Sequence, residues 1–279
     1  MTGLDRRAAL IAGLAAGAGA GAAQARDGGT LALTIEGTPR QSGLLIARTA
    51  PGAAGSFGDL NVRADSSGLL LLGLDRDAPA RMTLDLQGAD GARAVRTLEV
   101  APRTYVTRRV DGVPQSRLDP PDSEAARIQR EVALKNRAFA SRAEVAGFLE
   151  RFTWPVPATR VTSPWGAQRI LNGTAQRPHY GVDIAGATGT TVRAPASGVV
   201  VIAEPDLFFE GGMVSIDHGQ GLITSYLHLS RVDAAPGQTV ARGAVLGAVG
   251  ARGRATGPHL CWRMRWRGKQ VDPSLHLAA

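Results

Sequence analysis

The eight residues HLCWRMRW, at positions 259–266, alternate between large apolar side chains and polar or ionisable ones. Because successive side chains of a β-strand point to opposite faces, this period of two predicts a strand. Four large apolar side chains would share one face and pack into a core: Leu260, Trp262, Met264 and Trp266. The opposite face would carry His259, Cys261, Arg263 and Arg265, with His259 and Cys261 about 7 Å apart along the strand. The pattern therefore predicts a sheet with one apolar face that packs into a core and an opposite face that carries reactive side chains.

Short β-like segments separated by glycine and proline recur along most of the chain. From about Thr30 to Arg103, alternating segments, the buried run GLLLLGL and a hairpin around Asp90 predict a small β-sandwich. It contains no histidine or cysteine, so we expect no catalysis there. Similar strands return from Phe152 onward. We predict a mainly β protein with a sandwich at 26–104, a helical connector at 105–151 and an antiparallel β domain at 152–279.

The connector begins with DGVPQSRLDPPDS, whose prolines interrupt regular structure. Ser123 can cap a helix that runs to about Ala140, and the capping box SRAE at 141–144 predicts a second, shorter helix. Both helices are rich in arginine and polar on one face. They could serve as a plain spacer or as a lid over the following domain, and both interpretations stay open.

The N-terminal segment has the pattern of an export signal. Arg6 and Arg7 precede a short apolar stretch of small residues, and Ala23-Gln24-Ala25 fits a signal-peptidase site. The paired arginines also suit a twin-arginine signal. We predict a signal peptide at 1–25, cleavage near Ala25, and a mature periplasmic protein. The alternative is an uncleaved anchor, although the apolar stretch is short for a membrane span.

The formal charge of +8 comes almost entirely from arginine, since Lys135 and Lys269 are the only lysines. Such a surface suits anionic wall polymers or membrane headgroups. No basic run or nucleic-acid motif accompanies the charge, so we expect no nucleic-acid partner. The one cysteine excludes an intramolecular disulfide. Beyond the N-terminus the densest apolar run has seven residues, so we expect no transmembrane segment in the mature chain.

Two further segments carry histidines in patterns that could bind a metal. In RPHYGVDIAG, His179 and Asp183 would lie about 13 Å apart on a regular strand, too far to share an ion. They could meet only if the chain bends near Gly181; otherwise His179 is a turn residue followed by a strand aspartate. The hairpin GMVSIDHGQGLITSYLHLS would turn at Gly219–Gly221 and place Tyr226 and His228 on one face.

The two remaining histidines suggest no catalytic role. His218 lies at the predicted hairpin turn, where we expect a structural function. His276, near the C-terminus, has no motif around it and is not assigned.

Together, HxxxD at 179–183, YLHLS at 226–230 and GPHLCW at 257–262 resemble the M23 family of zinc metallopeptidases, also called the lysostaphin or LytM-domain family. The resemblance covers roughly 154–273. It implies a LytM-type β domain, one Zn²⁺ ion, and hydrolysis of peptide cross-links in peptidoglycan. By position, His179 and Asp183 would be zinc ligands, and His228 and His259 would be catalytic. Cys261 stands where the family has a third, histidine ligand, and we expect its thiolate to bind the zinc. The resemblance leaves the substrate-binding residues unknown.

Two alternatives to a peptidase follow from the same segments. A LytM-type adaptor would use the cleft to bind and activate another envelope hydrolase without cutting anything itself. A lipoyl or biotin carrier is suggested by VRAPASGVVV and VARGAVLGAVG. A carrier needs a lysine on its exposed hairpin, and neither Lys135 nor Lys269 is in that position, which excludes it.

Overall fold

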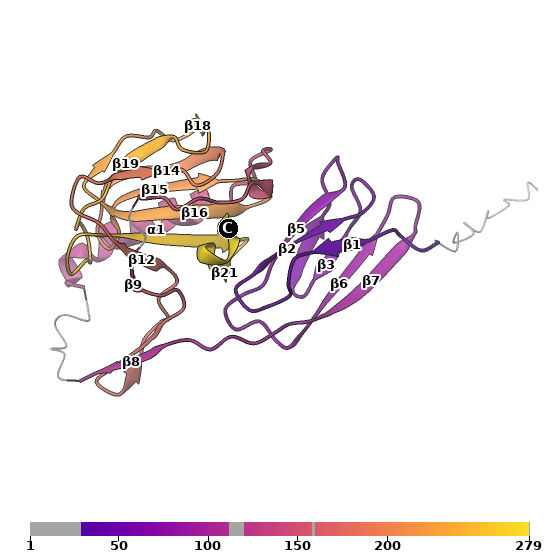
Figure 1. Cartoon of the computed structure of the whole chain (residues 1–279), viewed down its shortest axis with the longest axis horizontal. Helices are drawn as coiled ribbons and strands as arrows, with labels where there is room; N and C mark the ends of the chain where they lie inside the picture. Colours follow the sequence, from indigo (N-terminus) through magenta and orange to yellow (C-terminus); the bar gives the residue numbers. More distant parts are fainter. Residues whose placement is uncertain (1–28, 112–119, 158–159, 279) are drawn as a thin grey trace, which may run out of the picture.

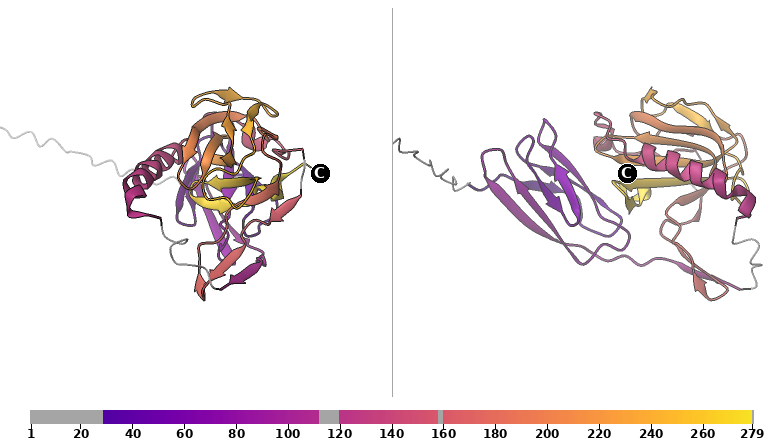
Figure 2. Two further views of the ribbon diagram at one scale, coloured as in Figure 1. Left: turned by 90° about the vertical axis from the view of Figure 1, so that its left-hand side faces the viewer. Right: turned by 180° about the vertical axis from the view of Figure 1, so that it is seen from behind.

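The computed structural model describes residues 29–111, 120–157 and 160–278, and the predicted signal peptide at 1–25 lies outside them. Two β-rich parts lie side by side and a single long helix crosses the second (Figures 1 and 2). The predicted mainly β fold is confirmed. Among the helices within the described ranges, none has the length and apolar character needed to cross a membrane. The predicted domain boundaries remain a proposal.

The N-terminal part is built from two antiparallel sheets, ordered β1-β2-β5 and β4-β3-β6-β7. Their inner faces share a core that is mainly leucine, and all five residues of β5 are buried, as the GLLLLGL run predicts. The hairpin predicted around Asp90 joins β6 to β7. The strands are β1 (Thr34–Glu36), β2 (Leu44–Arg48), β3 (Ala54–Phe57), β4 (Leu60–Arg63), β5 (Leu69–Gly73), β6 (Arg81–Gln87) and β7 (Arg93–Glu99).

The C-terminal part is organised around one large sheet, ordered β18-β14-β15-β16-β20-β12-β9, with β21 paired to β20. Two smaller sheets, β13-β19-β17 and β11-β10-β8, flank it. The strands are β9 (Val161–Ser163), β10 (Gln168–Leu171), β11 (Thr174–Ala175), β12 (Val182–Ala185), β13 (Thr191–Arg193), β14 (Gly198–Leu207), β15 (Gly211–Asp217), β16 (Leu222–Leu229), β17 (Arg231–Val232), β18 (Thr239–Val240), β19 (Val245–Ala248), β20 (His259–Trp266) and β21 (Lys269–Val271).

The predicted strand at 259–266 is β20, and its faces divide as the alternation predicts. Leu260, Trp262, Met264 and Trp266 belong to the main core. Cys261 packs on the opposite side, against Leu227 and Met213. This strand pairs with β16 on one side and with β12 on the other, which places it at the centre of the large sheet.

The connector differs from the prediction in three ways. Strand β8 (Thr107–Val110) pairs in parallel with β10 and so belongs to the C-terminal part. The first helix exists as α1 (Ala125–Phe139), but Ser123 does not cap it, because it lies in the short 3-10 turn η2 (Asp122–Glu124). The second α-helix predicted from 141–144 is absent; only the turn η3 (Gly147–Leu149) forms.

Tertiary contacts explain why the SRAE segment does not form a helix. The Ala143 backbone N–H donates to the Asp217 carboxylate at 2.8 Å, and the Phe148 N–H donates to the His218 carbonyl at 2.9 Å. These bonds tie the segment to the β15–β16 hairpin. Local capping preference is a weak signal that such contacts override. Helix α1 lies across the large sheet near β14 (Figure 2).

The two β parts share one continuous hydrophobic core. Trp266 of β20 lies against β5, where a Cβ at Gly73 would stand 2.8 Å from the indole ring, so this approach requires glycine. The side chain of Gln220, at the β15–β16 turn, accepts from the Leu71 N–H at 2.7 Å and donates to the Leu69 carbonyl at 3.1 Å. The final short turn, η4 (Pro273–His276), follows β21.

Candidate metal centre

Three side chains with metal-binding atoms converge at the pairing of β12 with β20. The register places Asp183 directly opposite Cys261. His179 lies just before β12, and its Nε2 approaches Asp183 Oδ1 at 3.2 Å and Cys261 Sγ at 3.4 Å. One ligand atom from each residue fits within 4.8 Å of the others. The structure thus brings together the three predicted ligands, whose role in binding metal remains a proposal.

The convergence depends on the predicted bend at Gly181. A regular strand would separate His179 from Asp183, but β12 begins only at Val182 and His179 instead pairs with Ala167 as an isolated bridge. A Cβ at Gly181 would stand 2.6 Å from Cys261 Sγ and 3.3 Å from His179 Nε2. Only glycine therefore leaves room for the sulfur and the imidazole to meet at this point.

The unpartnered atoms and the charges of the cluster fit a bound cation. Asp183 Oδ1 is buried and has no hydrogen-bond partner, although it faces two imidazoles. Burial opposes a charged His179 imidazole, but Asp183 and Cys261 outweigh it and raise its pKa to about 9. Burial also opposes the charged Asp183 carboxylate, but His179 outweighs it and lowers its pKa. A site that holds a positive charge this strongly suits Zn²⁺, for which imidazole, carboxylate and thiolate are all good ligands.

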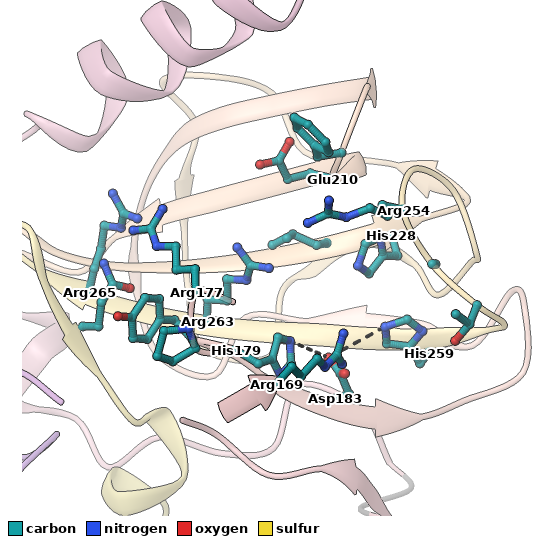
Figure 3. Close-up of a pocket in the computed structure, with 17 residues that line it drawn as sticks. Arg169, Arg177, His179, Asp183, Glu210, His228, Arg254, His259, Arg263 and Arg265 are labelled. Atoms are coloured by element: carbon teal, nitrogen blue, oxygen red, sulfur yellow. Dashed lines mark ion pairs between the residues drawn. The ribbon is translucent and has the colours of Figure 1, made fainter. Parts of the chain in front are cut away.

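His228 and His259 stand beside the cluster, with ring centroids 4.8 Å apart (Figure 3). His228 Nδ1 lies 2.9 Å from the Arg252 carbonyl, and His259 Nδ1 lies 2.8 Å from the Gly257 carbonyl. Carbonyl oxygens only accept, so both Nδ1 atoms carry the proton and both Nε2 atoms are available to the cleft. His259 Nε2 is 3.7 Å from Asp183 Oδ1. Burial, more than any other factor, lowers the pKa of His228 to about 4, so this imidazole is neutral at pH 7.

The prediction that Tyr226 and His228 share a face is wrong. Tyr226 is fully buried in the main core, whereas His228 lines the cleft. The cause is the backbone of His228, whose φ of 67° lies in the left-handed region. A residue in that conformation interrupts the alternation of side-chain direction along a strand. For a residue other than glycine it costs conformational free energy, and such strained residues cluster at functional sites.

The other two histidines lie outside the cleft. His218 is buried, its Nδ1 2.7 Å from the Ser197 carbonyl and its Nε2 2.7 Å from the Thr224 hydroxyl, which agrees with a structural role. His276, which the sequence left unassigned, lies in η4, and its Nε2 is buried without a partner.

The cluster opens into a cleft of about 340 Å³ whose walls are rich in arginine (Figure 3). Strand parity predicted that Arg263 and Arg265 share the face of His259 and Cys261, but no sequence pattern predicted an arginine-lined cleft. Arg169, Arg177 and Arg254 come from loops and from a strand that no periodic pattern links to the site, so only the fold reveals them.

Residues 177–273 match the family model described as peptidase family M23. The DD-carboxypeptidase/endopeptidase Mpg of Neisseria meningitidis is 40% identical over 119 residues, which cover 43% of this chain and 27% of that protein. The peptidoglycan DD-endopeptidase ShyA of Vibrio cholerae is 39% identical over 114 residues, which cover 40% of this chain and 26% of that protein. The chain thus spans about a quarter of the length of these relatives.

One solved structure extends the similarity beyond the C-terminal part. A Pseudomonas aeruginosa protein described as an M23 peptidase candidate aligns with a TM-score of 0.67 and 28% identity. The alignment covers 86% of this chain and 96% of that one. This coverage extends beyond the family match at 177–273.

Proposed function

We propose that this chain is a zinc-dependent endopeptidase that hydrolyses peptide cross-links of peptidoglycan, since residues 177–273 match the family model described as peptidase family M23. One observation carries the proposal: His179 and Asp183, which converge with Cys261, line a cleft that also holds the imidazoles of His228 and His259. The peptidoglycan DD-endopeptidase ShyA of Vibrio cholerae, to which this chain is similar, supports the choice of substrate.

In this proposal His179, Asp183 and Cys261 hold one zinc ion. When bound, zinc supplies a Lewis acid that makes a water more acidic and polarises the scissile carbonyl. Three protein ligands are the number found in catalytic zinc sites, which keep a further position for water.

His228 is the proposed general base. Its Nδ1–H is fixed on the Arg252 carbonyl, so the lone pair of Nε2 faces the cleft and can accept a proton from the attacking water. The water oxygen bonds to the carbonyl carbon, the carbon–nitrogen bond breaks, and the proton held on Nε2 passes to the leaving amine. Its low pKa keeps His228 neutral and ready for this step at pH 7.

His259 is the proposed stabiliser of the developing charge. Its Nδ1–H is fixed on the Gly257 carbonyl. When Nε2 also carries a proton it can donate to the carbonyl oxygen as that oxygen becomes negative. Asp183 Oδ1 lies 3.7 Å from this Nε2.

We also propose that the protein is exported and works in the periplasm. The support is the signal-like sequence before Arg26 and the similarity to ShyA, which is named as a peptidoglycan DD-endopeptidase.

The purified mature protein tests the proposal. We expect about one zinc per chain by elemental analysis and release of peptides with new termini from purified peptidoglycan. A chelator should abolish the release, and added zinc should restore it. The adaptor alternative, favoured by Cys261 replacing a histidine, predicts no release by this protein alone and increased release by another wall hydrolase.

A further inference from the structure

Five arginine side chains line the cleft that holds the metal cluster: Arg169, Arg177, Arg254, Arg263 and Arg265. Figure 3 shows three of them, Arg177, Arg263 and Arg265, on the side of the cluster away from His259, and Arg254 on the side of His228. Positive charge therefore flanks the proposed reaction centre in both directions along the cleft.

Among the residues that the structure describes, none of these five guanidinium groups pairs with a carboxylate, and Arg263 Nε donates to Cys261 Sγ at 3.4 Å. Seven other arginines do form ion pairs with carboxylates: Arg48, Arg76, Arg81, Arg93, Arg103, Arg127 and Arg231. Only two acids line the cleft, and both are engaged. Asp183 belongs to the metal cluster, and Glu210 bonds to Lys135 of α1 at 2.6 Å. The cleft thus has an excess of positive charge that the protein does not neutralise.

Aromatic rings hold several of these groups in place. The Arg265 guanidinium lies 3.9 Å from the ring centroid of Phe139, which belongs to α1. Arg254 lies 4.9 Å from the Phe209 centroid and Arg177 lies 5.3 Å from the Tyr180 centroid. Stacking of this kind fixes the orientation of the planar guanidinium group. Its N–H groups can still bind a carboxylate through two parallel hydrogen bonds.

The arginines also repel one another. Burial, followed by the charges of Arg263 and Arg177, lowers the pKa of Arg265 to about 10. The group is still charged at pH 7, so a bound anion would relieve this repulsion as well as form new hydrogen bonds.

We propose that the cleft selects peptides that carry free carboxylates on both sides of the scissile bond, and that Arg177, Arg254 and Arg265 determine this specificity. The inference rests on the proposed endopeptidase function and adds the substrate class. Stem peptides whose carboxyl groups are free would be preferred over the same peptides with carboxamides. An amide keeps the shape of a carboxylate but loses the charge and one acceptor oxygen.

A matched pair of cross-linked stem peptides, one with free carboxyl groups and one with carboxamides at the same positions, tests this. We expect kcat/KM of the zinc-loaded protein to be at least about tenfold higher for the acid form. Arg177→Gln and Arg265→Gln should each reduce that preference severalfold. Arg177 is exposed, so its substitution should not disturb folding. Arg96→Gln removes the same charge from an exposed position on β7 and should leave the preference unchanged.

Binding of the same two peptides to the His228→Ala variant, measured by calorimetry, separates this inference from the proposed function. Suppose that the zinc-loaded protein with its native sequence cleaves neither peptide, but the acid form binds to the variant at least about tenfold more tightly than the amide form. Peptidase activity is then refuted and the acidic specificity stands. If both peptides are cleaved and bound equally well, the function stands and the specificity is refuted. If the preference for the acid form is unchanged in both Arg177→Gln and Arg265→Gln, the assignment of the specificity to these arginines is refuted as well.

Discussion

The two β parts of this chain are built by the same rules but bury different kinds of side chain. Among the described residues up to 104, Ser42 is the one buried polar side chain, and the core is otherwise apolar. In the C-terminal part ten buried polar side chains lie between Ser163 and Asp272. Burying a polar group costs free energy unless it is hydrogen-bonded or paired. The contrast indicates that the N-terminal part is stabilised by apolar packing. The C-terminal part buries polar side chains at a cost in folding free energy, and some of these side chains form the proposed site.

A hydrogen-bonded chain shows how that cost is offset away from the metal cluster. His218 Nδ1–H donates to the Ser197 carbonyl, so its Nε2 accepts from the Thr224 hydroxyl, and Thr224 in turn accepts from Tyr226. Every member of this chain is satisfied. Asp183 Oδ1 and His179 Nδ1 are, by contrast, among the buried atoms without a partner, and both belong to the predicted ligand cluster.

The largest effect should come from removing a ligand. His179→Ala and Asp183→Ala should each reduce zinc content from about one per chain to near zero, with cleavage falling to background, because two ligands rarely retain zinc. Asp85→Ala, which removes a carboxylate paired with Arg93 in the N-terminal part, is the control and should keep full zinc and activity. Circular dichroism should show an intact β fold in all three. Full zinc retention by both cleft variants would refute the assignment.

A smaller loss is expected at the two imidazoles beside the cluster. His228→Ala and His259→Ala should keep zinc but cut peptide release by about 10²–10⁴, the usual contribution of general acid–base groups. Parallel measurement of zinc content and rate separates this role from that of a ligand. Unchanged rates in both variants, or metal loss in both, would contradict it.

Substitution of one glycine in each part should affect different properties, zinc affinity in the C-terminal part and fold stability in the N-terminal part. Gly181→Ala should weaken zinc affinity by about ten- to a hundredfold with little loss of fold stability, because its Cβ would displace Cys261 Sγ. In the N-terminal part a Cβ at Gly55 would stand 1.9 Å from the Asp85 carbonyl oxygen. Gly55→Ala should therefore lower unfolding free energy by about 1–3 kcal/mol and leave zinc binding unchanged. Zinc titration and thermal melting of both variants check the pair; a reversed pattern would break the comparison.

Acid should affect the C-terminal part first, because burial lowers the pKa of His218 to about 4 while the N-terminal part has no histidine. In the unfolded chain the His218 imidazole binds a proton near pH 6.5, whereas in the folded protein it stays neutral until about pH 4. Its contribution to the free energy of unfolding is therefore fully present above pH 6.5 and is lost as pH falls toward 4, by about 3 kcal/mol at most. Hydrogen exchange at pH 7 and pH 5 should show protection falling around β15 and β16 before β6 and β7. Equal loss in both parts would count against this.

Periodic patterns predicted the fold class and the two faces of β20, because alternation is a local property of the chain. The ligand set His179, Asp183 and Cys261 came from the resemblance to the M23 family, and its role in binding metal stays a prediction. What failed depends on distant partners. The SRAE segment does not become a helix because Asp217 and His218 hold it, and β8 is recruited by β10. The left-handed backbone of His228 has no signature in YLHLS. The arginine walls of the cleft come from separate loops and strands, which only the fold brings together.

Cys261 decides whether the C-terminal part is a true metal centre, and absorption of the cobalt-substituted protein tests this most directly. The structure places its sulfur 3.4 Å from His179 Nε2, on the side of β20 away from the main core. We predict a thiolate-to-cobalt charge-transfer band that disappears in Cys261→Ser. We expect Cys261→His to keep the metal and to hydrolyse faster, because imidazole donates less negative charge than thiolate and leaves the ion a stronger Lewis acid. A cobalt-loaded protein without that band would contradict the account.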